Sequence, residues 1–262
     1  MAQKRKRRQS RVILSIAGYD PSSGAGITAD IKTIAAHGCY GVSCITALTV
    51  QSTQGVKRVK PVQGSVIAET LEHLADDLEI TAIKIGMLGS AEAAKAVAAF
   101  LKRYEPKIVV LDPIIRSSSG AELLSKEGLQ ILKKNILPYV TVVTPNVDEA
   151  AVMTMLKVSN LEQMRLAAMR LHELGAKSVI VTGGHLAPPN DLISSQGKIK
   201  ILKGRKISTR STHGTGCAFS TALACNLALG EDMVSAAKAA KHFVATALRN
   251  APKVGKGTGP IL

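Results

Sequence analysis

Short apolar runs alternate with segments of helical periodicity along almost the whole chain, and this alternation constrains the fold more than any other feature. The runs have strand length and are rich in Val, Ile and Leu, which is typical of strands buried on both faces. Strands separated by helices of about 10 to 15 residues indicate a mainly parallel sheet. We therefore expect a three-layer α/β/α fold. The predicted strands are residues 11–18, 40–51, 81–88, 106–115, 140–146 and 176–185. The predicted helices between them are residues 27–38, 66–78, 90–104, 126–138 and 160–175.

The last third of the chain shows a different pattern. Residues 191–196 and 198–209 form short alternating segments, which predict a small antiparallel hairpin. Two helices, at residues 214–230 and 233–250, complete the order. No shift in composition and no linker divides the chain, so we expect a single domain at residues 11–262 and a disordered basic arm at residues 1–10.

The chain is strongly basic, with 34 Lys and Arg against 19 Asp and Glu and a formal net charge of +15. Five of the positive charges lie in residues 4–8, which we interpret as a solubilising tail. An arm that binds nucleic acid is the alternative. We do not expect a nucleic-acid partner, because the chain has no Trp and only 3% aromatic residues for base stacking. A basic body suits an enzyme with anionic substrates.

No apolar run reaches the roughly 18 residues that a membrane-spanning helix needs. The basic N-terminus is not followed by the apolar core of a secretion signal. We therefore expect a cytoplasmic protein with no membrane partner. The four cysteines show neither a Cys-x-x-Cys pair nor the spacing of a zinc site, so free thiols are expected. Cys39, Cys44 and Cys225 are expected in the core.

In sheets of this kind ligands bind beyond the carboxyl ends of the strands, so the segments that follow the strands are the candidate site. The first strand leads into a loop with Gly24 and Gly26. This loop is too long for a dinucleotide-binding turn, and we interpret it as the wall of a small-molecule pocket. Asp30 lies one turn into the next helix and is expected to reach this pocket; a solvated helix position is the alternative. Gln51 ends the second strand, and its amide suits a ring with adjacent donor and acceptor atoms.

Oxygen ligands follow two later strands. Asp112 follows the fourth predicted strand, and Asn146 and Glu149 follow the fifth. Carboxylates from separate strand ends suit Mg²⁺, which takes one or two of them together with phosphates and water. Asn146 and Glu149 also have the spacing of a helix capping box, and both interpretations can hold together. The glycines that follow the sixth strand would let a nucleotide approach the backbone, and no Walker A pattern exists in the chain.

The segment Gly214-Thr215-Gly216-Cys217 lies where a loop becomes a helix. Consecutive backbone N–H groups at the positive end of a helix dipole form an anion hole, which can stabilise the charge of a phosphoryl group in transfer. A helix N-terminus lowers the pKa of a thiol, so Cys217 is a candidate base for an alcohol. A buried core cysteine is the alternative. A dyad of His213 with Cys217 is disfavoured, because the two residues flank a glycine turn.

Several blocks in this order resemble the hydroxymethylpyrimidine/phosphomethylpyrimidine kinases of thiamine biosynthesis, a family of the ribokinase-like superfamily. They are AGYDPSSGAGITADIKTIAAHGCYGVSCITALTVQST, KIGML, VVLDPII, SSSGAELL, ILPYVTVVTPNVDEA, GGHL and THGTGCAFSTALA. The resemblance covers about residues 11 to 250. It implies ATP-dependent phosphorylation of 4-amino-5-hydroxymethyl-2-methylpyrimidine and then of its monophosphate, with Mg²⁺, by a homo-oligomer that is usually a dimer.

The resemblance also implies a role for each matching position. It makes Cys217 the catalytic base, with Gly214, Thr215 and Gly216 as the anion hole. The residues that it places around the pyrimidine are Gly18, Asp30, Gln51, Met87 and Ile114. The residues that it places at the nucleotide and phosphates are Asn146, Thr182, Gly184 and Arg116, and those that serve the metal are Asp112 and Glu149.

Two positions depart from the family pattern. The family often has lysines where this chain has Thr182 and Ser118, and those lysines would lie near phosphates. Arg116 is close by in the sequence and is a candidate substitute. Two alternative functions stay open: a pyridoxal or pyridoxine kinase on the same fold, and a non-catalytic protein that senses a ligand or binds nucleic acid.

Overall fold

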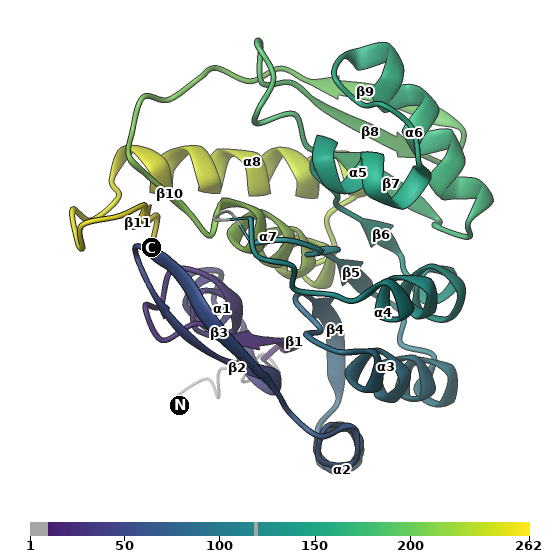
Figure 1. Cartoon of the computed structure of the whole chain (residues 1–262). Helices are drawn as coiled ribbons and strands as arrows, with labels where there is room; N and C mark the ends of the chain where they lie inside the picture. Colours follow the sequence, from purple (N-terminus) through teal and green to yellow (C-terminus); the bar gives the residue numbers. More distant parts are fainter. Residues whose placement is uncertain (1–9, 118–119) are drawn as a thin grey trace, which may run out of the picture.

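The structure is a computed structural model that describes residues 10–117 and 120–262 (Figure 1). The predicted arm at residues 1–10 therefore lies outside the described residues except for Ser10, and Ser118 lies outside them as well. Within these described ranges, no helix is long and apolar enough to cross a membrane.

One nine-stranded sheet runs through the described residues, in the order β3–β2–β1–β4–β5–β6–β7–β8–β9. Every neighbouring pair from β2 to β7 is parallel, and the pairs β2–β3, β7–β8 and β8–β9 are antiparallel. The predicted mainly parallel sheet and its hairpin, β8–β9, are confirmed. The strands are β1 (Val12–Tyr19), β2 (Tyr40–Ser52), β3 (Gly55–Pro61), β4 (Ile80–Ile85), β5 (Val109–Leu111), β6 (Val142–Val143), β7 (Ser178–Val181), β8 (Asp191–Ser195) and β9 (Lys198–Leu202).

Helices cover both faces of this sheet (Figure 1). One face carries α1 (Gly26–Ala36), α7 (Thr215–Ala228) and α8 (Met233–Arg249). The other face carries α2 (Gly64–Asp77), α3 (Ala91–Tyr104), α4 (Lys126–Ile131), α5 (Val147–Thr154) and α6 (Leu161–Glu173). Alternate residues of a strand face opposite layers: Ala82 packs toward α7, while Ile83 and Ile85 pack into the other core. The apolar runs of the sequence follow from this two-sided burial.

The structure differs from the prediction in four places. The strand β3 was not predicted, because it is an edge strand with three basic side chains in seven residues. The predicted helix at residues 126–138 is α4 followed by a π-helical turn, η1 (Leu132–Ile136), and a 3₁₀ turn, η2 (Leu137–Tyr139). The helix α5 was anticipated only through the capping-box spacing of Asn146 and Glu149, and a second small sheet, β10 (Ser211–His213) with β11 (Gly259–Pro260), was not predicted.

Candidate active site

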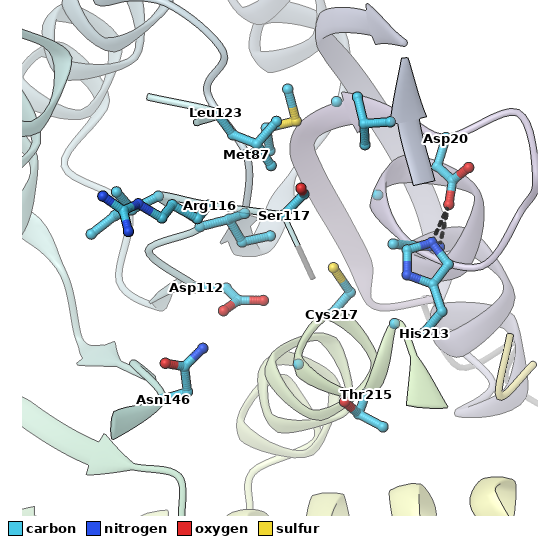
Figure 2. A pocket seen from close by; sticks show the side chains of 18 of the residues that line it. Asp20, Met87, Asp112, Arg116, Ser117, Leu123, Asn146, His213, Thr215 and Cys217 are labelled. Carbon is cyan, nitrogen blue, oxygen red and sulfur yellow. Dashed lines mark hydrogen bonds and ion pairs between the residues drawn. The ribbon is translucent and has the colours of Figure 1, made fainter. Parts of the chain in front are cut away.

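A cavity of about 730 Å³ opens where the parallel strands end. Its walls come from the segments after β1, β2, β4, β5, β6 and β7 and from the N-terminus of α7. Figure 2 shows Thr215 and Cys217 on α7, Asp112 and Asn146 on one side, and Asp20 with His213 on the other. The expected location beyond the carboxyl ends of the strands is confirmed.

The segment Gly214-Thr215-Gly216, called the anion loop below, is shaped by backbone contacts that require glycine. Gly214 is the N-cap residue of α7 with φ of 86°, and a Cβ atom there would collide with the carbonyl oxygen of Gly24. A Cβ atom on Gly26, at φ of 59°, would collide with the carbonyl oxygen of Gly18. All three residues of the anion loop line the cavity. The first N–H groups of α7 have no acceptor within the helix, so they are available to an anion in the cavity.

Cys217 lines the cavity in the first turn of α7 and is only 4% exposed. Burial raises the pKa of its thiol to about 12, although the Lys84 ammonium opposes this shift and the Gly26 N–H donates to the sulfur. The sequence predicted a lowered pKa from the helix N-terminus. The direction of the shift is opposite to that prediction, because the loss of solvent outweighs the Lys84 ammonium and the Gly26 N–H, which favour the thiolate. Cys217 therefore faces the cavity as a neutral thiol.

Asp30 does not line the cavity, and its predicted contact with a ligand there is wrong. Its side chain is completely buried between α1 and the sheet. The carboxylate accepts hydrogen bonds from Ser15 Oγ at 2.6 Å and Thr221 Oγ1 at 2.7 Å, and from Lys84 Nζ at 3.0 and 2.9 Å. These four bonds use the acceptor capacity of a carboxylate. Asp30 instead holds a buried ammonium below the site.

The Lys84–Asp30 pair lies directly under Cys217. Thr221 follows Cys217 by four residues, so both side chains lie on the same face of α7 and Thr221 is one turn deeper. Burial alone would lower the pKa of Lys84, but Asp30 outweighs burial and holds that pKa above its usual value, with help from Cys217 and Asp112. The Lys84 ammonium therefore stays charged and places a permanent positive charge beneath the site.

Oxygen atoms gather at one end of the cavity. The side chain of Asn146 accepts from the N–H groups of Asp148 and Glu149, and Glu149 Oε2 accepts from the Asn146 N–H at 2.9 Å. The predicted capping box is therefore confirmed, and Asn146 and Glu149 also line the cavity. Asp112 Oδ2 accepts from Ser220 Oγ at 3.1 Å. Burial raises the pKa of Asp112 to about 6 against the effect of Lys84, and burial with repulsion from Asp112 raises the pKa of Glu149 to about 8.

The loop after β7 reaches the cavity through Thr182 and His185. Gly184 is exposed and does not line the cavity, and its role at the nucleotide stays a prediction. The loop turns at Gly183 and carries the backbone of Gly184 outward, where a Cβ atom would meet nothing within 4 Å. Arg116 lines the cavity on the same side as Asp112 and Asn146 (Figure 2).

Another wall of the cavity is apolar and suits a flat ring. Met87 and Leu123 form a small cluster with Ala47, and Ile114 packs against it. Gly18 keeps this wall open, because a Cβ atom there would lie 2.9 Å from Met87 Sδ. Gly18, Gln51, Met87 and Ile114 all line the cavity, as the sequence predicted.

Sequence reasoning missed Asp20 as a site residue. Its Oδ2 lies 2.7 Å from His213 Nε2, and both residues line the cavity. Its carboxylate also accepts from Ser22 and from the Ala25 N–H at 2.9 Å, which fixes the glycine loop after β1. Two cues in the sequence pointed to it: Asp20 is an acid in a strand-end loop, and His213 had no expected partner.

The chain is similar to known proteins in sequence and in fold. The sequence matches the phosphomethylpyrimidine kinase family over residues 20–262. The hydroxymethylpyrimidine/phosphomethylpyrimidine kinase of Aquifex aeolicus is 42% identical over 248 residues, which are 94% of this chain and 97% of that protein. The thiamine biosynthesis bifunctional protein ThiED of Geobacter sulfurreducens is 39% identical over 95% of this chain and 51% of its own length.

Two solved structures show the same fold. The phosphomethylpyrimidine kinase of Clostridium difficile superposes with a TM-score of 0.81 at 36% identity, covering 91% of this chain and 99% of the other. The pyridoxal kinase of Staphylococcus aureus in complex with AMP-PCP and pyridoxal superposes with a TM-score of 0.86 at 32% identity, covering 96% and 93%.

Proposed function

This chain belongs to the phosphomethylpyrimidine kinase family, and from that premise we propose the reaction that it catalyses. The terminal phosphoryl group of ATP passes to the hydroxymethyl oxygen of 4-amino-5-hydroxymethyl-2-methylpyrimidine, and a second one passes to the monophosphate, in thiamine biosynthesis. One observation carries the proposal: within the family match, a single cavity joins an apolar ring wall, a thiol and an anion loop.

Different parts of the cavity have different roles in this reaction. Met87, Leu123 and Ile114 offer a flat apolar surface to the ring and exclude water from one side of it. The N–H groups of the anion loop face the place where negative charge spreads over the phosphoryl oxygens in transfer. Fixed donors of this kind need no reorganisation during the reaction, which is the main electrostatic contribution that we assign to the protein.

Cys217 is the residue that we propose to take the proton from the hydroxymethyl group. It must first release its own proton, because burial keeps the thiol protonated in the free protein. The buried ammonium of Lys84 favours the thiolate and partly offsets the cost of burial. Phosphoryl transfer has a loose transition state with little covalent chemistry for the protein, so a base that acts late is sufficient.

We also propose that Asp112 and Glu149 hold Mg²⁺ with the phosphates of ATP. The buried carboxylate of Asp112 repels that of Glu149, and a divalent cation would relieve this repulsion. Among the described residues, no group of three or more His, Cys, Asp or Glu could enclose a metal ion. Mg²⁺ is commonly bound by one or two carboxylates, and phosphate oxygens and water complete its coordination shell. The ion would supply neutralisation of phosphate charge, together with Arg116.

We further propose a cytoplasmic homo-oligomer whose catalytic unit is residues 11–262. The four free cysteines support a reducing compartment. Three exposed large apolar side chains on β2, those of Tyr40, Leu48 and Val50, support a self-association surface.

The second candidate function is a pyridoxal kinase. The observation in its favour is the superposition on the pyridoxal kinase of Staphylococcus aureus over most of both chains. Both ring types carry a hydroxymethyl group, so the apolar wall alone does not separate them. The kinetics of the two alcohols, measured side by side, decide between them.

The test is a paired assay with MgATP in which mass spectrometry follows the mono- and diphosphate of the pyrimidine. We expect both products from the wild type and a drop of about 10²-fold or more in Cys217→Ala, the usual range for loss of a general base. Cys39→Ala is the matched control, because Cys39 does not line the cavity. Phosphorylation of pyridoxal with no pyrimidine product would overturn the proposal in favour of the second candidate.

A further inference from the structure

Gln51 lies between two polar side chains, each of which donates its hydrogen to an acceptor other than Gln51. Its amide nitrogen is 3.1 Å from His213 Nε2, and its amide oxygen is 3.2 Å from Thr49 Oγ1. All three residues line the cavity. The orientation of this amide matters, because one end of it accepts a hydrogen bond and the other end donates.

The proton on His213 is fixed by Asp20. Asp20 Oδ2 lies 2.7 Å from His213 Nε2, and Figure 2 marks this contact beside the cavity. The pKa of Asp20 is lowered: burial opposes the shift, but the contact with His213 and two hydrogen bonds from Ser22 outweigh it. An ionised carboxylate only accepts, so Nε2 carries a hydrogen and donates it to Asp20. A protonated ring nitrogen cannot accept a hydrogen bond from Gln51.

The proton on Thr49 is fixed in the same way. Its hydroxyl lies 2.9 Å from the carbonyl oxygen of Tyr19, which only accepts. A hydroxyl has one hydrogen, and the shorter contact with the carbonyl takes it. Toward Gln51, Thr49 Oγ1 is then an acceptor, and it needs an N–H group opposite.

Both neighbours therefore require the same orientation of the Gln51 amide, with its oxygen toward His213 and its nitrogen toward Thr49. A half-turn about the Cγ–Cδ bond exchanges the oxygen and the nitrogen and leaves the shape of the side chain unchanged. After this half-turn the oxygen shares the one Nε2 hydrogen of His213 with Asp20 in a three-centre hydrogen bond, and the nitrogen donates to Thr49 Oγ1. In the network Asp20–His213–Gln51–Thr49–Tyr19 no donor then faces another donor, and the hydrogens of His213 Nε2 and Thr49 Oγ1 each have an acceptor.

We propose that Asp20 and the Tyr19 carbonyl, acting through His213 and Thr49, lock Gln51 in this orientation and thereby select the substrate ring. His213 and Thr49 are positioning residues. One lone pair of the oxygen and one hydrogen of the nitrogen remain for the cavity, with the acceptor on the His213 side. This edge pairs with a ring that displays an amino group beside an unprotonated ring nitrogen, and it rejects the corresponding oxo ring with a protonated nitrogen.

This inference rests on the proposed function for its substrate class, but the proton positions can be tested without turnover. The first experiment is a long-range ¹⁵N–¹H correlation spectrum of the histidine rings in the free protein. His213→Phe assigns the signal among the six histidines by its loss. We expect a hydrogen on Nε2 of His213. A neutral ring with its hydrogen on Nδ1 overturns the inference.

The second experiment compares kcat/KM for the aminopyrimidine alcohol and its 4-oxo counterpart. The wild type should prefer the amino ring by about 10²-fold or more, because the wrong ring leaves polar groups unpaired. His213→Phe and Thr49→Val should each reduce this preference by about 10-fold, the value of one hydrogen bond, and the double variant should nearly abolish it.

His73→Phe is the control for the second experiment, because His73 is an exposed residue of α2 that does not line the cavity. It should leave the preference unchanged. An equal loss of kcat/KM for both rings in His213→Phe and Thr49→Val would mean a merely structural role and would overturn the inference. A wild type that phosphorylates neither ring would refute the proposed function, while the spectrum would still decide the proton positions.

Discussion

Lys84 Nζ lies 2.9 Å from Asp30 Oδ2, and both side chains are completely shielded from solvent. Lys84 extends from near the C-terminal end of the strand β4 into the layer between the sheet and the helices α1 and α7. A buried charge is tolerated only with a partner, so each member of the pair depends on the other. This relationship leads to the first prediction.

Removal of one member of the pair should destabilise the protein strongly. We expect Lys84→Met to lower the free energy of unfolding by about 3 to 5 kcal/mol, because it leaves the Asp30 carboxylate buried and unpaired. The double variant Lys84→Met/Asp30→Asn should recover a large part of this loss. Urea denaturation measures both. The exposed pair Lys95–Glu127, at 2.8 Å, is the control, and Lys95→Met should change little. Equal, small effects of the buried and exposed variants would contradict the prediction.

The raised pKa of Cys217 predicts a loss of stability in alkaline solution. Below pH 9 the thiol is protonated in both the folded and the unfolded chain. Between pH 9 and pH 12 the unfolded chain releases the proton first, so the free energy of unfolding falls as the pH rises. Relative to Cys217→Ala, the wild type should lose on the order of 1.4 kcal/mol for each pH unit above 9. Denaturation at pH 8, 9 and 10 measures the difference, and a constant difference would show that the thiol is not perturbed.

The anion loop should not tolerate a side chain at its first residue. Gly214→Ala places a methyl group against the carbonyl oxygen of Gly24, and the loop must move away. We expect kcat to fall by about 10²-fold or more, because the N–H donors lose their alignment with the phosphoryl group. Gly197→Ala is the control that separates the cost of a side chain at positive φ from the cost of the collision. Gly197 also has a positive φ (71°), but the space around it is open. This substitution should cost only about 1 kcal/mol of stability. A fully active Gly214→Ala would show that the loop is not the anion site.

Arg116 should matter more for the second phosphorylation than for the first. It lines the cavity near Asp112, while Thr182 brings no charge to the same end. We expect Arg116→Ala to lower kcat/KM for the monophosphate by about 10- to 100-fold, the value of a hydrogen bond to a charged group, with a smaller effect on the alcohol. Arg116→Lys should restore part of the loss. Both steps are measured with the purified alcohol and monophosphate, and two unchanged steps would remove Arg116 from the mechanism.

The sequence was most informative where burial on both faces restricts the choice of residues. Val109, Val110 and Leu111 read as a strand because each contacts a helix layer. The basic strand β3 carries no such signal, because it is the end strand of the sheet and four of its seven residues are exposed. The π-helical turn at Leu132–Ile136 leaves no trace either, because its residues keep helical spacing.

Site residues were predictable when they lie at strand ends and not when their partner comes from a distant segment. Their position made Gln51 and Asp112 candidates, and both line the cavity. Asp30 was misplaced because its partner, Lys84, is 54 residues away and belongs to a strand that otherwise reads as apolar. A lysine inside such a strand is itself a signal that a buried acid must exist. The pKa of Cys217 was predicted in the wrong direction because burial depends on the whole fold.

The contact between Gly24 and Gly214 has a thermodynamic consequence. It joins the loop that borders the ring pocket to the loop that faces the phosphoryl group, with backbone against backbone. We expect a ligand that shifts either loop to shift the other, so that occupancy of one subsite changes the affinity of the other. Linkage requires this change to be reciprocal: the factor by which nucleotide alters the dissociation constant of the alcohol equals the factor by which the alcohol alters that of the nucleotide.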